Sequence, residues 1–538
     1  MALLALALVY AAPIQPLNWN VTGHYALVQA FADGTPVIDD YLDNAPTGDR
    51  VNVDGHWYSD RAPGLAYWSL PAFAALDLAG LAGGQTEPVG PHPNDRAIWL
   101  LGLWGTVLPG FVLLLLVRSV AERMNPTFGT VAAVTVGCGT LLLPFATMLF
   151  AHVLAATLLF GSFTVLFRER LRPSRSLWRL GAAGLLAGLA FTTEYPAALV
   201  GVVLAAYALA GVRDLRGAMD RLWPYALGAF LGALPLALYN HWAFGSFTKV
   251  AYAGLEEHQQ GFFGIDTPDP GAAVQLLLTS RGLFTLAPVL VMAALGIVLL
   301  YRRGWRAEAL ASGAIALVLL VYNSGYYLPF GGEGPGPRFL LLSLPFLALG
   351  LGSAFARFPG VTLALAGASI AAMLIPTMTG PGVGSDPETG IWTERLGDGD
   401  LQATAFTAFG VDTPWLSWAP ALVLLILVLV FALRGLRRPS NSQLAVGLAA
   451  VAAWTLFAAF GPDALGIDRA AEKTVAFGLE IPHPYGQRPI ETLVLIAAGA
   501  GVVVLSAAAF SRRAARAAPI PAATAGSPPA GSRSARAP

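Results

Sequence analysis

The sequence predicts an all-α fold, a polytopic transmembrane helical bundle, and three observations point to it. Hydrophobic residues make up 56% of the 538 residues, whereas charged residues make up only 12%. A soluble domain carries about a quarter charged residues. The apolar residues also gather in many separate segments long enough to cross roughly 30 Å of hydrocarbon. Arginine clusters alternate with acidic loops between these segments, and we count about 13–14 spans on this basis.

Charge and cysteine content exclude several classes of protein. The formal net charge is zero, so nothing indicates a nucleic-acid partner. The chain has one cysteine, Cys138, which lies in an apolar stretch. Because a disulfide and a cysteine-based metal site each need more than one cysteine, neither can form within the chain. The bilayer is therefore the first partner that the composition predicts.

The arginine clusters predict the orientation, because basic loops remain on the cytoplasmic side. The loops between the clusters are acidic or rich in Gly and Pro, and we expect them outside a plasma or inner membrane. The clusters are Arg118–Arg123, Arg168–Arg179, Arg213–Arg221, Arg302–Arg306, Arg434–Arg438 and Arg512–Arg516; the outer loops are 13–64, 244–281, 327–337, 379–414 and 462–490.

Two apolar segments need a decision. Residues 65–83 resemble a helix, but a span there would invert every later basic loop, and Trp68, Pro71 and Asp77 interrupt it. We therefore expect an interfacial helix in the first outer loop. The N-terminal segment lacks the basic start of a signal peptide, so we expect a first transmembrane helix. Residues 180–193 and 195–211 are short and predict a bent pair.

The chain divides into three parts on this reading. Residues 1–350 form a first transmembrane module that includes the first outer loop. Residues 351–510 add further transmembrane helices with the outer loops 379–414 and 462–490. Residues 511–538 are rich in Ala, Pro, Ser and Arg and predict a disordered cytoplasmic tail.

The first outer loop carries the chemistry. Its acids alternate with aromatic residues and glycines instead of forming one charge run; they are Asp33, Asp39, Asp40, Asp43, Asp49, Asp54 and Asp60. The stretch Asp54–Gly64 also places Arg61 and a Pro-Gly turn just before the apolar segment. An arginine at the membrane surface suits the phosphate of a lipid, which it can bind with two hydrogen bonds.

The order of these motifs resembles GT-C glycosyltransferases. HYALVQAFADG, IDDY and DGHWYSDRAPGLAYWSLPAF resemble the first periplasmic loop of the polyprenyl-phosphate-dependent family 39 group, which includes the aminoarabinose and protein mannosyl transferases. SDRAPG corresponds to the family's Lys-Pro-Pro-Leu or Lys-Ala-Pro-Gly element, with Arg61 in place of Lys. Later elements that resemble the bacterial branch are FAHVLAATL with His152, TTEYPAAL with Glu194, YNHWAFGS with Asn240, SRGLF with Arg281 and GPGPRFLLLSLPF with Arg338.

The resemblance implies a glycosyltransferase (a hexosyl or pentosyl transferase) that moves a sugar from a polyprenyl-phosphate donor to an extracytoplasmic glycan, lipid or protein acceptor. An inverting transfer needs a carboxylate base. Family members carry an Asp-Glu pair where this sequence has Val21 and Thr22, so the base must be another carboxylate. We expect Asp39 or Asp40, then Asp54, as the base. The residues expected to bind the lipid phosphate or the sugar are His56, Tyr58, Asp60, Arg61, Glu194 and Arg338.

Structural alternatives stay open for several of these residues. Asp39 and Asp40 could shape a turn, and Arg61 could be an interfacial anchor. Arg338 could snorkel toward the membrane surface, while Glu194 could cap the helix that follows it. His152 is expected to pack at a helix start.

We expect no cofactor and no metal site, although His56 with Asp54 and Asp60 could hold a divalent cation. Two other functions stay open. One is a flippase or transporter of lipid-linked saccharides, which needs related halves and polar residues along the spans. The other is a catalytically inactive relative that binds polyprenyl lipid.

Overall fold

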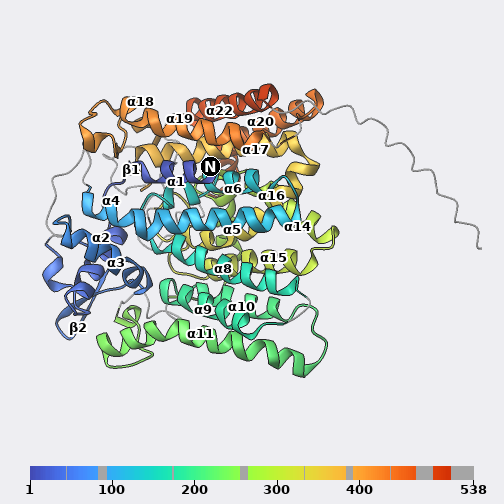
Figure 1. Cartoon of the computed structure of the whole chain (residues 1–538). Coiled ribbons are helices and arrows are strands. Elements are labelled where there is room, and N and C mark those ends of the chain that lie inside the picture. The colour runs from blue at the N-terminus through green and yellow to red at the C-terminus, as the bar shows by residue number, and fades with distance from the viewer. Residues whose placement is uncertain are drawn as a thin grey trace, which may run out of the picture.

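The computed structural model describes most of the chain. The described residues are 1–43, 45–82, 94–172, 175–254, 264–332, 334–382, 392–434, 436, 438–467 and 489–510. The predicted tail 511–538 and most of the predicted outer loop 462–490 lie outside these residues. The all-α expectation is confirmed: long helices lie side by side in one bundle, and the first-loop elements project from one end of it (Figure 1).

The first 172 residues contribute helices to both the bundle and the projecting loop. α4, η2 and α5 run on as one helix, Arg96–Met124, with a π-helical turn in the middle. The elements are α1 (Ala2–Ala11), β1 (Pro13–Ile14), α2 (Trp19–Ala32), η1 (Asp39–Tyr41), β2 (Arg50–Val53), β3 (His56–Ser59), α3 (Gly64–Leu78), α4 (Arg96–Gly102), η2 (Leu103–Val107), α5 (Leu108–Met124), α6 (Gly129–Cys138), α7 (Leu142–Phe145) and α8 (Ala151–Arg170).

The remaining elements complete the bundle. They are α9 (Leu177–Thr193), α10 (Ala197–Ala208), α11 (Leu215–Phe244), η3 (Ala251–Gly254), α12 (Pro270–Leu278), α13 (Leu283–Leu286), α14 (Val289–Arg302), α15 (Arg306–Ser324), η5 (Arg338–Ser343), α16 (Leu344–Arg357), α17 (Pro359–Thr379), α18 (Trp392–Asp398), β4 (Ala403–Thr404), η7 (Thr407–Phe409), α19 (Pro414–Leu433), α20 (Asn441–Ala464) and α22 (Pro489–Phe510).

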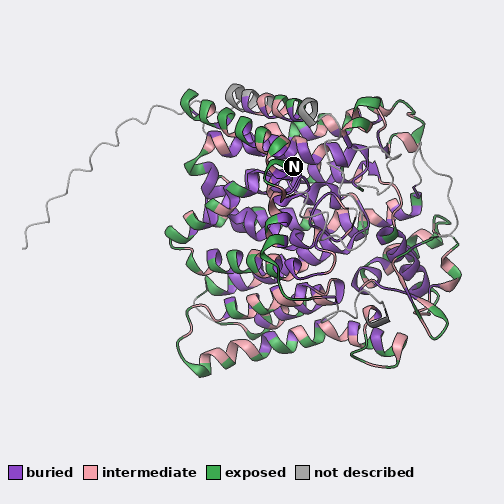
Figure 2. Ribbon diagram, turned by 180° about the vertical axis from the view of Figure 1, so that it is seen from behind, coloured by how far each residue is buried: buried purple, intermediate pink, exposed green. Residues whose placement is uncertain are grey.

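The helices have the lengths and surfaces of a membrane protein. In the described part of the chain, eight helices are long and apolar enough to cross a membrane, or up to nine if a pair bent by 92° counts as one span. Four further apolar helices are shorter, including α9 and α10, which form the pair expected at 180–211. The expected total of about 13–14 includes such short segments. Figure 2 shows buried residues concentrated inside the bundle and exposed residues on its outer helices.

The exposed side chains of the outer helices are themselves apolar. Leu227, Phe230 and Leu231 on α11 are about half exposed or more, as are Ile426 and Phe431 on α19. A water-soluble protein rarely presents such continuous apolar faces, because each exposed side chain costs free energy in water. A hydrocarbon surround removes that cost.

The interfacial helix is shorter than expected. The sequence predicts it over 65–83, whereas α3 ends at Leu78. The chain then turns at Gly80, whose φ of 69° is a left-handed conformation that glycine adopts without strain and that ends helices. α3 is not among the helices long enough to span, and its position at the membrane surface stays a prediction.

The predicted outer loops meet at one end of the bundle. β1 pairs with β4, which joins the loop 13–64 to the loop 379–414. Ile265 pairs with Tyr326, and the ring of Tyr58 packs on Phe244 with centroids 5.1 Å apart. The loops that follow α1, α11, α15 and α17 therefore share one end.

The arginine clusters meet at another set of helix ends. Arg170 at the end of α8 pairs with the buried Glu308 at the start of α15. Arg168 donates to Ser119 on α5 (3.1 Å), and Arg175 pairs with Asp220 on α11 (3.0 Å). This separation of basic and acidic ends is what the orientation rule requires. Which end faces the cytoplasm stays a prediction.

Glycines set a close contact between two helices of the bundle. α9 packs along α11, and a Cβ atom on Gly184 or Gly188 would overlap the backbone carbonyls of Tyr225 or Ala229. Gly228 and Gly232 meet α9 backbone in the same way. Helices in membranes rely on such small residues, because close backbone contact replaces the hydrophobic driving force that water provides.

Adding one methyl group to this contact should destabilise the bundle. We expect Gly188→Ala to cost about 1–3 kcal/mol, because the backbone of α11 must move away. Thermal unfolding in detergent, followed by size-exclusion chromatography, measures the effect. The matched control is Gly313→Ala on α15, where a Cβ atom meets nothing within 4 Å. Equal melting temperatures for both variants would contradict the close contact.

Candidate functional site

A β-hairpin builds the base of the candidate site. Asp54 and Gly55 form its two-residue turn, with φ angles of 54° and 89°. Asp-Gly suits this turn, because both central residues must adopt positive φ angles. Val53 then pairs with His56, and the ladder runs back to Arg50 opposite Ser59. One step further, the Asp60 N–H donates to the Asp49 carbonyl (3.3 Å), so the hairpin brings Asp49 beside Arg61.

Helix α2 holds the open end of this hairpin. The hydroxyl of Thr22 donates to the Pro46 carbonyl (2.9 Å), which ties the segment before the hairpin to the helix. Ser59 donates to the carbonyl of Gly23 (3.2 Å) and accepts from the Arg61 N–H (3.2 Å). Both strands are therefore fastened where Asp49 and Arg61 leave them.

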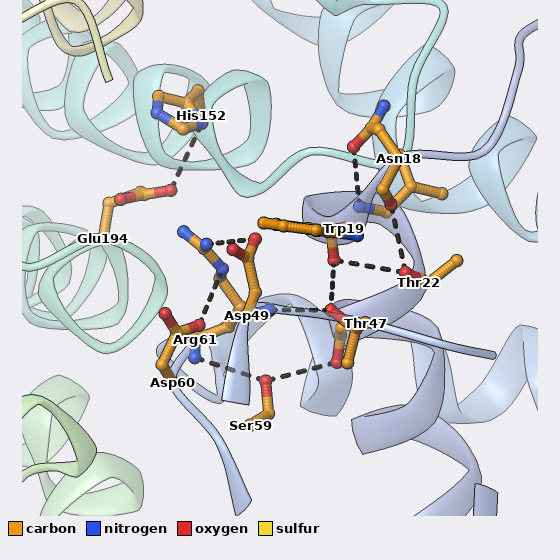
Figure 3. Close-up of polar contacts among 12 residues, drawn as sticks. Asn18, Trp19, Thr22, Thr47, Asp49, Ser59, Asp60, Arg61, His152 and Glu194 are labelled. Carbon is orange, nitrogen blue, oxygen red and sulfur yellow. Dashed lines mark hydrogen bonds and ion pairs between the residues drawn. The ribbon is translucent and has the colours of Figure 1, made fainter. Parts of the chain in front are cut away.

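Arg61 lies between two carboxylates. It forms an ion pair with Asp49, and its Nε lies 2.9 Å from Oδ1 of Asp60 (Figure 3). All three side chains are largely buried, with 13%, 19% and 11% exposure. Burial by itself lowers the pKa of Arg61, but Asp49 and Asp60 outweigh it and raise the pKa above its usual value. Arg61 therefore stays charged at any working pH.

A second acid–base pair faces Arg61 from the bundle. Glu194 lies at the break between α9 and α10, and its Oε1 is 3.3 Å from Nδ1 of His152 at the start of α8 (Figure 3). Gly64 lets the loop approach this break, since a Cβ atom there would lie 2.5 Å from the Thr193 hydroxyl. The Pro-Gly element after Arg61 thus has a packing reason.

Arg338 supplies the other cation, at the start of η5. Its guanidinium lies over the rings of Phe150 and Phe339, 5.9 and 5.4 Å from their centroids. Among the described residues it has no ion-pair partner within 4.0 Å, and its buried Nε has no hydrogen bond. Arg281 helps to hold the preceding loop by donating to the Gly332 carbonyl (2.8 Å).

His24 is a buried imidazole whose pKa both arginines lower. This side chain on α2 is 1% exposed, and its Nδ1 has no hydrogen bond in the described structure. Burial, followed by the charges of Arg61 and Arg338, lowers the pKa of His24 to about 3. Both guanidinium groups therefore act on one imidazole, which stays neutral at physiological pH.

Asp60 responds in the opposite direction. Burial and the charge of Asp49 raise the pKa of Asp60 to about 7, although Arg61 and Arg338 oppose the shift. The site therefore holds a carboxylate that changes protonation near neutrality.

The structure brings together only part of the predicted set. Asp60, Arg61, Glu194 and Arg338 surround one region. Tyr58 lies in strand β3, and its buried ring packs against Phe244 at the end of α11.

The other predicted residues serve the loop itself. Asp39 accepts from the Trp57 N–H (2.6 Å) and contacts Nδ1 of His56 (2.7 Å), which is 61% exposed. Asp40 is exposed on η1, and Asp54 occupies the hairpin turn. These contacts match the alternative in which Asp39 and Asp40 shape a turn.

The sequence prediction gave no site role to three of these residues: Asp49, His24 and His152. Asp49 was listed only among the loop acids, although the Asp-Gly turn flanked by alternating apolar residues predicts the hairpin register that places it. His152 was named in the FAHVLAATL motif but was expected only to pack at a helix start, and the neighbours of His24 come from other elements.

In the described part of the chain, no three His, Cys, Asp or Glu side chains are placed to hold a metal ion. His56, Asp54 and Asp60 in particular have separate surroundings, since His56 contacts Asp39 and Asp60 contacts Arg61.

Comparison with known proteins gives distant structural likenesses. No family model matches the chain, and no curated protein sequence matches it. The structure is similar to that of ArnT from Cupriavidus metallidurans bound to undecaprenyl phosphate, with 17% identity over 94% of this chain and 77% of the other, and a TM-score of 0.45. It is also similar to the oligosaccharyltransferase of Archaeoglobus fulgidus, with 12% identity over 80% and 57% of the chains and a TM-score of 0.39.

Titration of Asp60 should be visible in the stability of the protein. Its pKa is about 7 when folded and about 3.9 in an unfolded chain. Between these values the folded state binds more protons, so Asp60 lowers stability as the pH rises. His24 acts in the opposite direction below about pH 6.5, because its folded pKa is the lower one. We expect the melting temperature of Asp60→Asn, relative to the unmodified protein, to rise between pH 4.5 and 7.5.

The control for this measurement is Asp54→Asn, which makes the same chemical change at an exposed turn. Asparagine also tolerates the left-handed conformation of that position. Its melting temperature should follow that of the unmodified protein at every pH. Parallel curves for all three proteins would show that Asp60 titrates normally.

Proposed function

We propose that this protein is a membrane glycosyltransferase that takes a sugar from a polyprenyl-phosphate donor. One observation carries the proposal: among the described residues the guanidinium of Arg338 forms no ion pair, and it lies within electrostatic range of the largely buried carboxylates of Asp49 and Glu194. A buried cation without a counterion is costly, so the site favours an anionic ligand. Tyrosines and carboxylates nearby suit the hydroxyl groups of a sugar.

The two arginines have different surroundings and therefore different proposed roles. The charge of Arg61 is balanced by Asp49 and Asp60, whereas Arg338 has no carboxylate within ion-pair distance among the described residues. We therefore assign the lipid phosphate to Arg338. Its guanidinium would stabilise the charge that develops on the phosphate as the bond to the sugar breaks.

Asp49 is the best-placed proton acceptor in this reaction. Its carboxylate is held by Arg61 and is 19% exposed, so an acceptor hydroxyl can reach it. Transfer forms a bond between that oxygen and the anomeric carbon, breaks the bond to phosphate and leaves the proton on the carboxylate. Attack from the side opposite the phosphate inverts the anomeric centre. This assignment replaces Asp39, Asp40 and Asp54, whose contacts lie within the loop.

The motif order that resembles the family 39 group supports the choice of donor. The broad separation of basic and acidic bundle ends supports an extracytoplasmic site, because the basic end is expected inside. The acceptor can be a glycan, a lipid or a protein on these grounds.

Transfer by the purified protein in nanodiscs tests the proposal. Undecaprenyl-phosphate sugars carrying a radiolabel serve as donors, and total envelope extract supplies acceptors. Removing the base should cost about 10²–10⁴-fold in rate, so Asp49→Asn should be nearly inactive. Arg338→Gln should weaken binding of undecaprenyl phosphate by about tenfold or more. Asp54→Asn, Asp39→Asn and Asp40→Asn should keep most of their activity.

Each alternative function has its own outcome. Binding of undecaprenyl phosphate that depends on Arg338, without transfer from any donor, would identify an inactive lipid-binding relative. Movement of lipid-linked sugar across liposomes without transfer would identify a flippase. Full transfer activity in Asp49→Asn would refute the assigned base.

A further inference from the structure

Trp19 lies next to the site, and the proposed transfer reaction gives it no role. Trp19 is 66% exposed although it opens α2, a helix that is otherwise largely buried. Its indole ring lies flat on Gly48, where a Cβ atom would be 2.6 Å from Cε3 and 2.8 Å from Cζ3. One face of the ring therefore covers the backbone, and the other face is open.

The open ring has a defined position relative to Asp49. The Thr47 hydroxyl donates to the Trp19 carbonyl (2.7 Å) and accepts from the Asp49 N–H (3.0 Å). In Figure 3 the ring extends toward the Asp49 carboxylate, and Asp49 directly follows Gly48, which the ring covers. A single threonine hydroxyl thus connects the backbone of the aromatic residue to that of the proposed base.

The indole N–H is also available. It donates to none of the described residues, unlike the N–H groups of Trp68 and Trp104, which donate to each other's carbonyls (3.1 and 2.8 Å). An open apolar ring with a donor at its edge and a carboxylate beside it offers three distinct contacts to one ligand.

We infer that Trp19 is a stacking platform for a carbohydrate acceptor, an inference that rests on the proposed function. The C–H face of a sugar ring packs on the indole, while a hydroxyl of the same ring points to Asp49. This geometry presents that hydroxyl to the base and its oxygen to the anomeric carbon of the donor. The acceptor is thereby a glycan, whereas a simple lipid or an unmodified peptide lacks the flat polyhydroxylated ring.

A membrane anchor is the rival explanation, since tryptophan is common at membrane interfaces. The surroundings of Trp19 favour a ligand. Its inner face is already occupied by Gly48, and the next residue along the chain, Asp49, forms the ion pair with Arg61. The stacked pair Trp68 and Trp104, with ring centroids 5.3 Å apart, has satisfied N–H groups and fits the anchor role better.

Saturation-transfer NMR on the whole protein in nanodiscs tests the inference directly. The probes are methyl glycosides of common hexoses and pentoses, which carry ring C–H groups and no lipid. We expect saturation of ring protons by at least one glycoside and about a fivefold loss in Trp19→Ala. Trp19→Phe keeps a flat ring and should keep about half of the signal or more.

A second variant moves the ring without removing it. Gly48→Ala inserts a methyl group under the indole and should reduce the signal as Trp19→Ala does. Its matched control is Gly397→Ala on α18, where a Cβ atom meets nothing within 4 Å. Undecaprenyl-phosphate binding, measured on the same samples, should be unchanged in all four variants, because it depends on Arg338.

The possible results separate the two proposals. Sugar saturation that depends on Trp19 supports the stacking platform even if no sugar transfer is detected. Failure to detect transfer from any donor would contradict the proposed transferase but not the platform. Absence of saturation from every glycoside, or an equal signal in Trp19→Ala, overturns the platform. A Trp19→Ala protein that loses only its stability in lipid, with the sugar signal intact, identifies a membrane anchor instead.

Discussion

The ion pairs of Arg61 are the interaction on which the rest of the site depends. A guanidinium this deeply buried needs opposite charge close by, because the surrounding protein cannot solvate it as water does. Asp49 and Asp60 supply that charge from the two strands of one hairpin. Because Asp49 and Asp60 pair with Arg61, they do not form ion pairs with Arg338 on the other side of the site. Among the described residues no carboxylate lies within ion-pair distance of Arg338, which is why we propose an anionic ligand as its counterion.

The helical bundle determines where this charge balance can act. Gly64 allows the loop to meet α9 at Thr193, the residue before Glu194. α9 is in turn fixed by its glycine contact with α11, so a shift of that helix would also move Glu194 relative to Arg61. The carboxylate of Glu194 lies 3.3 Å from the imidazole of His152, so these two buried or largely buried polar groups face each other inside the bundle. Helix α9 therefore links the glycine packing of the bundle to the position of a charged group in the site, Glu194.

Much of this architecture could be predicted from the sequence, because hydropathy and arginine position act over whole segments. The bundle and the common end of the outer loops follow from such segment-level signals, whereas the expected gathering of Arg61, Glu194 and Arg338 rested on the motifs that resemble the family 39 group. The choice among carboxylates did not, because it depends on strand register. In a ladder that alternates faces, a carboxylate's position relative to the turn decides its partner. Asp54 carries the turn itself, and Asp49 therefore reaches Arg61.

The same register gives a physical reading of the absent Asp-Glu pair. Where the resembling family has acids on its first loop helix, this chain has Val21 and Thr22, both buried. The Thr22 hydroxyl bonds to Pro46, three residues before Asp49. A carboxylate at either of these buried positions would lose its hydration. A hydroxyl there instead fixes the segment that carries Asp49 to Arg61. Helix α2 thus holds the segment before the hairpin in place, and the Asp49 carboxylate at the open end of the hairpin pairs with Arg61.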